Sequence, residues 1–270
     1  KLVAAENGYD ALMRSLKKPA PVTDGRKAAI IGGGPTGIAA AYFLGRAGIP
    51  VTVFEKSSRL GGVPMQVIPG FRISEAAIEK DIALMQFYGA EIRLNTPAPS
   101  VAELNVAGYT HIFFAVGAGK AGRLNIPGNV VPVIQWLRDL KAGKKVSLGH
   151  VAVIGGGNTA MDAARAAIRS GAASATLVYR RTKRYMPADA EELELAIADG
   201  VRFLELAAPV AQENGRLKCE RMTLGAPDEK GRRSPLPTGE LMEFDCDTVI
   251  AAVGEQVEGE LFTANGIAVN

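Results

Sequence analysis

Cysteine is scarce in this chain, and its scarcity excludes two kinds of redox chemistry. Only Cys219 and Cys246 are present among 270 residues, and they do not form a C-x-x-C pair. The chain therefore lacks the redox-active disulfide of that motif. Four cysteines are needed to hold an iron–sulfur cluster, so no such cluster is expected within the chain, nor any other metal site. So little cysteine is typical of a reducing compartment, and we expect a cytoplasmic protein.

An excess of charge of one sign is also missing. The formal net charge is +3, and no run of five or more basic residues occurs, so we expect no nucleic-acid partner. Residues 28–45 carry no charge and reach the length of roughly 18 residues that a membrane helix needs. The segment Gly32-Gly33-Gly34-Pro35 would break such a helix, so we expect no membrane span. The chain begins at Lys1, which predicts a fragment or a processed product.

What is present twice is a glycine-rich turn. "IIGGGPTGIAAAYFLGRAG" occupies residues 30–48, and "VIGGGNTAMDAARAAIRSG" occupies residues 153–171. The first glycines of the two turns, Gly32 and Gly155, lie 155 − 32 = 123 residues apart. A repeat of this length indicates a duplicated domain.

Strand-like and helix-like segments alternate along both halves of the chain. Strands are predicted at residues 28–31, 51–55, 90–94, 110–116, 151–154, 175–180, 201–206 and 247–253. Helices are predicted at residues 7–18, 35–47, 74–88, around Trp136, 158–170 and 189–199. Asn214-Gly215 between two alternating runs predicts a hairpin over residues 210–224. The expected fold class is α/β, with two Rossmann-like, doubly wound parallel sheets covered by helices on both faces.

The first turn has the spacing of a dinucleotide-binding site. Gly32, Gly34 and Gly37 form a G-x-G-x-x-G motif between a strand and a helix. The first glycine permits the tight turn, the second lets a pyrophosphate approach, and the third lets helix and strand pack closely. Glu55 ends the next strand, where a carboxylate can accept hydrogen bonds from ribose hydroxyls. Gly61-Gly62 in the following loop would also suit a close approach to the ligand.

The second turn differs at two places. Ala160 replaces the third glycine after Gly155 and Gly157, which is a tolerated variant expected to move the helix slightly off the strand. The next strand ends in Tyr179, Arg180 and Arg181 where the first unit has Glu55. Guanidinium groups can bind a 2′-phosphate, through charge-assisted bonds of roughly 1.5–3 kcal/mol each. The first unit therefore favours a ribose with free hydroxyls, the second favours NADPH over NADH, and together they predict transfer from NADPH to a flavin.

At this point the chain resembles a known family. The segments "GGGPTGIAAAYFLGRAGIPVTVFEKSSRLGG", "FFAVGAG", "VAVIGGGNTAMDAARAAIRSGA", "YRRTKRYMPA" and "DTVIAAVGE" are similar to the glutamate synthase small-subunit family. That family includes electron-input domains of dihydropyrimidine dehydrogenase and a selenate reductase flavoprotein subunit. The resemblance implies FAD on the first unit and NADPH on the second, which is inserted within the first. The implied cofactor-binding residues are Gly32, Gly34, Pro35, Thr36, Gly37, Glu55, Lys56, Gly62, Gly117, Gly155, Gly157, Asn158, Thr159, Ala160, Arg180, Arg181 and Gly254.

The resemblance also implies a domain organisation. Residues 1–24 are expected to form an N-terminal helix and linker, 25–120 an incomplete FAD-binding domain and 121–254 an NADPH-binding domain, with 255–270 starting the return to the first. The implied function is an NADPH-dependent oxidoreductase that passes a hydride to FAD. Electrons would then reach iron–sulfur centres, and a catalytic partner domain or subunit, outside this chain. Since the cofactors carry this chemistry, no catalytic side chain is assigned.

Three other functions share some of these sequence features. A disulfide reductase of the thioredoxin reductase type also pairs FAD with NADPH but needs a C-x-x-C motif. An NADPH–ferredoxin reductase of the adrenodoxin reductase type has a similar layout and fits "YRRTKRYMPA" less well. A non-catalytic fragment that binds NADPH and serves as a scaffold is the alternative from a different class. Reducible, retained flavin would separate it from an electron-input module.

Overall fold

The chain divides into two compact units in a computed structural model that describes residues 8–229 and 231–268. One unit comprises Lys1–Gly119 and Val257–Asn270, and the other comprises Lys120–Gln256, so the second is inserted in the first. In the part of the chain described, no helix is long and apolar enough to span a lipid bilayer. The assignment of FAD to one unit and NADPH to the other stays a prediction.

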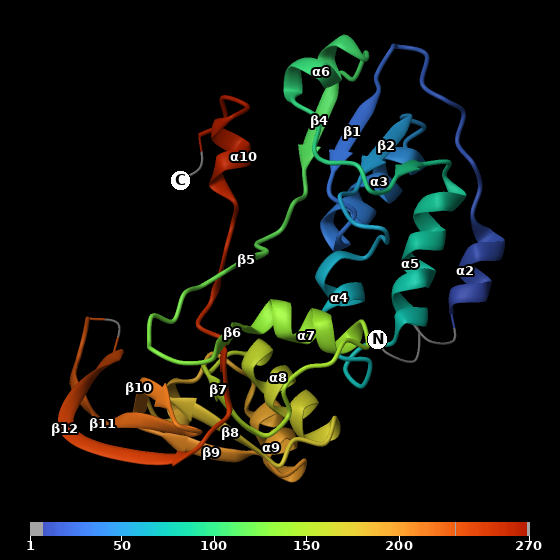
Figure 1. Cartoon of the computed structure of the whole chain (residues 1–270). Coiled ribbons are helices and arrows are strands. Elements are labelled where there is room, and N and C mark those ends of the chain that lie inside the picture. Colours follow the sequence, from blue (N-terminus) through green and yellow to red (C-terminus); the bar gives the residue numbers. More distant parts are fainter. Residues whose placement is uncertain (1–7, 230, 269–270) are drawn as a thin grey trace. The chain divides into compact units, whose positions relative to one another are not determined.

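The first unit is built on a parallel sheet of four strands in the order β3-β2-β1-β4 (Figure 1). The strands are β1 (Ala28–Ile31), β2 (Val51–Phe54), β3 (Glu91–Arg93) and β4 (His111–Phe114). The helices are α2 (Tyr9–Ser15), α3 (Pro35–Arg46), α4 (Gly62–Gln66), α5 (Glu75–Phe87), α6 (Val101–Val106) and α10 (Gly259–Thr263). All four residues of β1 and of β2 are buried, as expected of central parallel strands.

Helices pack on both faces of this sheet. Ile30 and Val53 pack with Ile38 of α3 and Met85 of α5. On the other face, Ile31 and Phe54 pack with Leu104 of α6 and with Tyr109. Phe114 of β4 also contacts Phe262 of α10, with ring centroids 5.4 Å apart.

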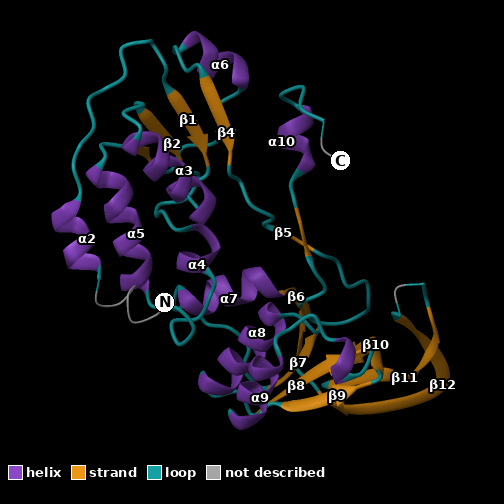
Figure 2. Cartoon of the chain, turned by 180° about the vertical axis from the view of Figure 1, so that it is seen from behind, coloured by secondary structure: helices purple, strands orange, loops and turns teal. Residues whose placement is uncertain are grey.

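The second unit has a parallel sheet of five strands, in the order β6-β13-β7-β8-β9. These strands are β6 (Val130–Pro132), β7 (His150–Ile154), β8 (Ser174–Tyr179), β9 (Arg202–Glu205) and β13 (Thr248–Ala251). The helices α7 (Val133–Lys141), α8 (Asn158–Arg169) and α9 (Ala190–Ala198) lie along one face of the sheet (Figure 2). The short strands β5 (Lys120–Ala121) and β14 (Glu255–Gln256) pair where the chain enters and leaves this unit.

The other face of the second sheet differs from the expectation of helices on both faces. A three-stranded antiparallel sheet covers it, formed by β10 (Ala207–Glu213), β11 (Arg216–Pro227) and β12 (Arg233–Asp245). Leu217 and Cys219 of this sheet pack on Ala152, Ile154 and Val178. The predicted hairpin at Asn214-Gly215 is confirmed, with both residues at positive φ. β12 was not predicted, because two prolines and Gly239 interrupt its sequence.

Most other predicted elements are confirmed, with boundaries shifted by a few residues. Ser74 caps α5 as predicted, its side chain accepting a hydrogen bond from the Ala77 amide. The predicted helix over residues 7–18 is α2, although residue 7 lies outside the described part. The short helices α4 and α6 were missed because each is only a turn or two long.

Candidate cofactor sites

The first glycine turn leaves space at one glycine only. A Cβ at Gly32 would meet the carbonyl oxygen of Ala115, and one at Gly37 would meet the carbonyl oxygen of Gly32. At Gly34 the nearest atom would be 3.9 Å away. Gly34 is also the N-cap of α3, with no side-chain hydrogen bond at the cap and Pro35 following in the first turn. The open glycine therefore lies where amide groups and the helix dipole favour a phosphate, which fits the expected FAD.

Glu55 is buried beside this turn. Its Oε2 accepts a hydrogen bond of 2.7 Å from the Gly33 amide, and its Oε1 accepts bonds from the amide and hydroxyl of Ser57. Each carboxylate oxygen has two lone-pair sites, so Oε2 can accept one bond more. The expected role toward a ribose hydroxyl is compatible with this geometry and stays a prediction.

The remaining predicted residues of the first unit lie around the turn or at the ends of neighbouring strands. The Gly61 amide donates to the Gly33 carbonyl at 2.8 Å, and a Cβ at Gly62 would lie 2.9 Å from the Gly34 Cα. Gly61 and Gly62 therefore lie close to the backbone of the glycine turn itself. Thr36 lies in the first turn of α3, Lys56 is exposed after β2, and Gly117 is exposed after β4 at a φ of +71°.

The second glycine turn repeats the arrangement. A Cβ at Gly155 would meet the Ala252 carbonyl, and one at Gly156 would fall within 3.0 Å of the ring of Tyr179. Nothing lies within 4 Å of a Cβ at Gly157, the N-cap of α8. Ala160 is 1% exposed, so the helix accommodates the methyl group for which Gly37 has no room. The pattern of one open glycine at a helix start fits the pyrophosphate of NADPH.

The structure resolves which residue stands in the place of Glu55. The Gly32 amide bonds to the carbonyl of Phe54, and the Gly155 amide bonds to the carbonyl of Val178. The next residues, Glu55 and Tyr179, are therefore equivalent. The sequence alone does not show whether Tyr179, Arg180 or Arg181 is the residue equivalent to Glu55.

The two arginines follow Tyr179 in different surroundings. Arg180 is exposed, and no described residue pairs with its guanidinium group. Arg181 is half-buried, and its Nε donates to the Arg233 carbonyl at 3.0 Å. This leaves the two terminal nitrogens of Arg181 for a ligand. Both arginines follow β8, whose Val178 carbonyl accepts the Gly155 amide, and their role in binding a nucleotide stays a prediction.

Asn158 and Thr159 begin α8 and contact other segments of the second unit. The Asn158 amide group both donates to and accepts from Asp189, at 3.2 and 3.1 Å. The Thr159 hydroxyl donates to Glu255 at 3.5 Å. Gly254, just before Glu255, has a φ of +112° and accepts the Gly122 amide through its carbonyl. No sequence signal indicated that Asp189 would hold Asn158.

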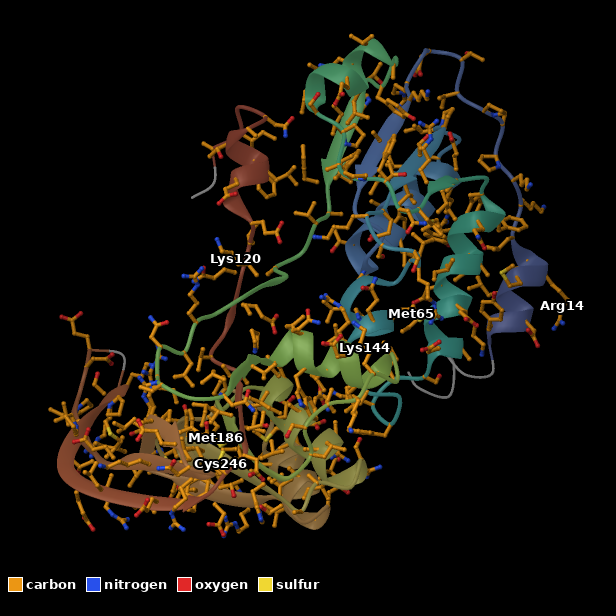
Figure 3. All side chains as sticks on the ribbon, viewed as in Figure 1. Arg14, Met65, Lys120, Lys144, Met186 and Cys246 are labelled. Carbon is orange, nitrogen blue, oxygen red and sulfur yellow. The ribbon has the colours of Figure 1, made fainter. Side chains whose placement is uncertain are left out.

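The two cysteines lie in the core of the second unit. Cys219 and Cys246 are fully buried; Figure 3 labels Cys246, as well as Met186 in the loop after the arginines. Burial raises the pKa of Cys219 to about 12 and that of Cys246 to about 11. Thiols with such pKa values stay protonated near neutral pH and are poor nucleophiles. Among the described residues, no cluster of metal-ligating side chains occurs.

Comparison with known proteins identifies the class. Residues 26–270 match the family described as pyridine nucleotide-disulphide oxidoreductase. The chain belongs to this family, which confirms an oxidoreductase with a flavin and a pyridine nucleotide as its cofactors. Its two cysteines are free thiols that do not form a C-x-x-C motif, so the given sequence does not contain the redox-active pair of that motif.

Particular relatives narrow the comparison. The chain is 41% identical to YgfK of Escherichia coli (strain K12), provisionally named an oxidoreductase, over 99% of this chain and 27% of that protein. It is 38% identical to the NADP(+)-dependent formate dehydrogenase subunit beta of Moorella thermoacetica, over 88% and 36%. It is 32% identical to the glutamate synthase [NADPH] small chain of Azospirillum brasilense, over 87% and 54%. The expected resemblance is thus confirmed, and the chain spans about a quarter to just over half of these relatives.

Solved structures agree on the fold. Lactococcus lactis thioredoxin reductase superposes with a TM-score of 0.66 at 19% identity, covering 90% of this chain and 82% of that one. A 2-naphthoyl-CoA reductase superposes with a TM-score of 0.69 at 22% identity, covering 92% and 36%. At these identities the likeness concerns the fold alone, and it agrees with an α/β fold built on two parallel sheets.

Proposed function

We propose that this chain is the NADPH-oxidising flavin module of a larger protein, in which FAD occupies the first unit and NADPH the second. The observation that carries the proposal is the exchange at equivalent positions. Glu55 presents a carboxylate beside the first turn, whereas Tyr179 followed by Arg180 and Arg181 stands beside the second. A carboxylate suits a free 2′-hydroxyl, and guanidinium groups suit a 2′-phosphate.

The nicotinamide and flavin rings supply hydride-transfer chemistry when both are bound. The contribution of the chain is binding and orientation. Gly34 and Gly157 are the open N-cap glycines of α3 and α8, so a pyrophosphate would have room at each helix start, where N–H groups would bind it. Proton transfer by a side chain is not needed for this step, which is consistent with assigning no catalytic residue.

The names of relatives support an NADPH-linked role and a larger assembly. They include an NADP(+)-dependent formate dehydrogenase subunit beta, an NADPH-Fe(3+) oxidoreductase subunit beta and a glutamate synthase [NADPH] small chain. The electron acceptor is therefore proposed to be an iron–sulfur domain or subunit outside this chain. A reducing compartment, the cytoplasm, suits the two unpaired thiols.

The test is an anaerobic titration of the chain, supplied with FAD, against NADPH and against NADH. Absorbance of the oxidised flavin is followed in the wild type, in Arg180→Gln and in the control Arg216→Gln. Arg216 lies in the same unit, where it forms ion pairs with Glu243 and Asp245. We expect NADPH to bleach the flavin at a concentration at least tenfold below that of NADH.

Arg180→Gln should remove most of this difference, and Arg216→Gln should keep it. If NADPH and NADH bleach the flavin of the wild type at the same concentration, the assignment of NADPH to the second unit is overturned. Nucleotide binding without any bleaching would favour the scaffold alternative.

A further inference from the structure

Residues 180–189, here called the arginine loop, are fastened to the second unit by hydrogen bonds within the chain. The Ala188 amide donates to the Gly156 carbonyl at 3.0 Å, and Asp189 exchanges two bonds with Asn158. The Lys183 amide donates to Glu205 at 2.9 Å. The loop thus returns to the glycine turn from which α8 starts.

Tyr179 contacts both the glycine turn and the arginine loop. Its side chain is buried, and its ring lies so close to Gly156 that a Cβ there would overlap it. Its hydroxyl donates a hydrogen bond of 2.6 Å to the carbonyl of Tyr185, in the middle of the loop. A phenylalanine would fill the same space without this bond, so packing alone does not explain the hydroxyl.

We propose that Tyr179 is a positioning residue for nucleotide selection. Its ring fills the place where Glu55 offers a carboxylate in the first unit, and its hydroxyl holds the arginine loop with Arg180 and Arg181 beside the glycine turn. The inference rests on the proposed NADPH site and deepens it. A loop held in its binding conformation loses less freedom when the phosphate binds, which raises affinity without a new contact.

The same hydroxyl should matter little for NADH. NADH lacks the 2′-phosphate, so the position of the arginine loop contributes little to its binding. The signature of a positioning role is therefore a change in the ratio of the two affinities. A purely structural role would weaken both nucleotides together and lower the melting temperature.

The experiment measures dissociation constants of the full chain for NADPH, NADH and 2′,5′-ADP by calorimetry. Tyr179→Phe is compared with Tyr109→Phe, whose buried hydroxyl in the first unit has no hydrogen-bond partner among the described residues. We expect Tyr179→Phe to weaken NADPH and 2′,5′-ADP about 3- to 10-fold, as for one hydrogen bond, and to leave NADH within about twofold. Tyr109→Phe should change none of the three.

Hydrogen exchange provides the second measurement, and it does not depend on nucleotide. Amides of residues 182–188 should exchange faster in Tyr179→Phe, while those of β7 and β8 stay as in the wild type. Tyr179→Leu, which removes the ring as well, should weaken NADPH further.

The possible failures are distinguishable. If the wild type prefers NADPH and Arg180→Gln loses this preference while Tyr179→Phe retains it, the positioning role is wrong and the proposed function stands. Equal weakening of NADPH and NADH by Tyr179→Phe also overturns the positioning role. If the wild type does not prefer NADPH at all, the proposed function fails and this inference fails with it.

Discussion

Glu55 and Tyr179 occupy equivalent positions in two β-α-β units and make opposite contacts there. The carboxylate of Glu55 accepts the amide of Gly33, in the middle of its glycine turn. The ring of Tyr179 covers Gly156, the equivalent glycine, and its hydroxyl donates away from the turn to Tyr185. One unit thus presents an acceptor to its turn, and the other presents an apolar surface with a basic loop beside it.

Replacing Glu55 by alanine should affect both the fold and the flavin. The Gly33 amide is buried and would lose its acceptor, which costs about 1–3 kcal/mol of unfolding free energy. FAD affinity should also fall, because the acceptor for the ribose hydroxyl is lost. Chemical denaturation and flavin fluorescence check the two effects. An unchanged affinity for FAD would remove Glu55 from the predicted site.

Alanine substitutions at Gly155 and Gly157 should have different effects, the first on stability and the second on nucleotide binding. Gly155→Ala introduces a methyl group against the Ala252 carbonyl, so it should destabilise the second unit by more than about 2 kcal/mol. Gly157→Ala meets no neighbour within 4 Å, so it should melt normally and bind NADPH at least tenfold more weakly. Trp136, the single tryptophan, lies in α7 and reports the unfolding of this unit. Normal NADPH binding by Gly157→Ala would contradict the pyrophosphate position.

The third position of the glycine motif should respond differently in the two units. A methyl group at Gly37 would meet the Gly32 carbonyl and the side chain of Ile30, so Gly37→Ala should destabilise by more than about 2 kcal/mol. Ala160→Gly should cost only about 1–2 kcal/mol, from helix propensity and one buried methyl group. Circular dichroism during denaturation compares the two variants. Similar costs would indicate that α3 can move away from β1 easily.

Asp199 should make stability depend on pH in the acid range. It accepts hydrogen bonds from Arg169 and Arg165 at 2.8 Å, and these bonds lower its pKa from 3.8 to about 2. A lowered pKa means that the contribution is full above pH 4 and is lost as the pH falls through about 2. Asp199→Asn should therefore cost about 1–2 kcal/mol at pH 7 and little near pH 2. Denaturant titrations at several pH values test this, with the exposed Asp81→Asn as the control. A cost independent of pH would assign the effect to shape and not to charge.

Cys219 and Cys246 should be silent toward thiol reagents in the folded chain. Both are fully buried, and burial raises the pKa of each thiol to about 11 or 12. Ellman's reagent should detect close to zero thiols in the native chain and two after denaturation. Fast labelling of the two thiols in the native chain, or disulfide formation coupled to NADPH turnover, would support the alternative hypothesis of a disulfide reductase.

Much of the fold was predictable because its signals are local. β1, β2 and β7 are short apolar runs, α3 and α8 begin directly after glycine turns, and Ser74 caps its helix through its own side chain. β12 was missed since Pro235, Pro237 and Gly239 argue locally against a strand. Pairing with β11 along much of its length stabilises it nevertheless, and pairing is not a local property.

The candidate site divides in the same way. The sequence alone determined that the chain has two glycine-rich turns and where the helix after each turn begins. It also determined that an acidic residue ends the strand after the first turn and that arginines end the strand after the second. Spacing and charge are properties of the linear sequence, so no folding is needed to find them. The tertiary structure decided which glycines are filled by neighbouring backbone and which stay open. It also placed Tyr179 in the position of Glu55 and closed the arginine loop through Tyr185, Asn158 and Glu205. These contacts depend on side chains from different strands and helices meeting at the sheet edge, and only folding brings them together.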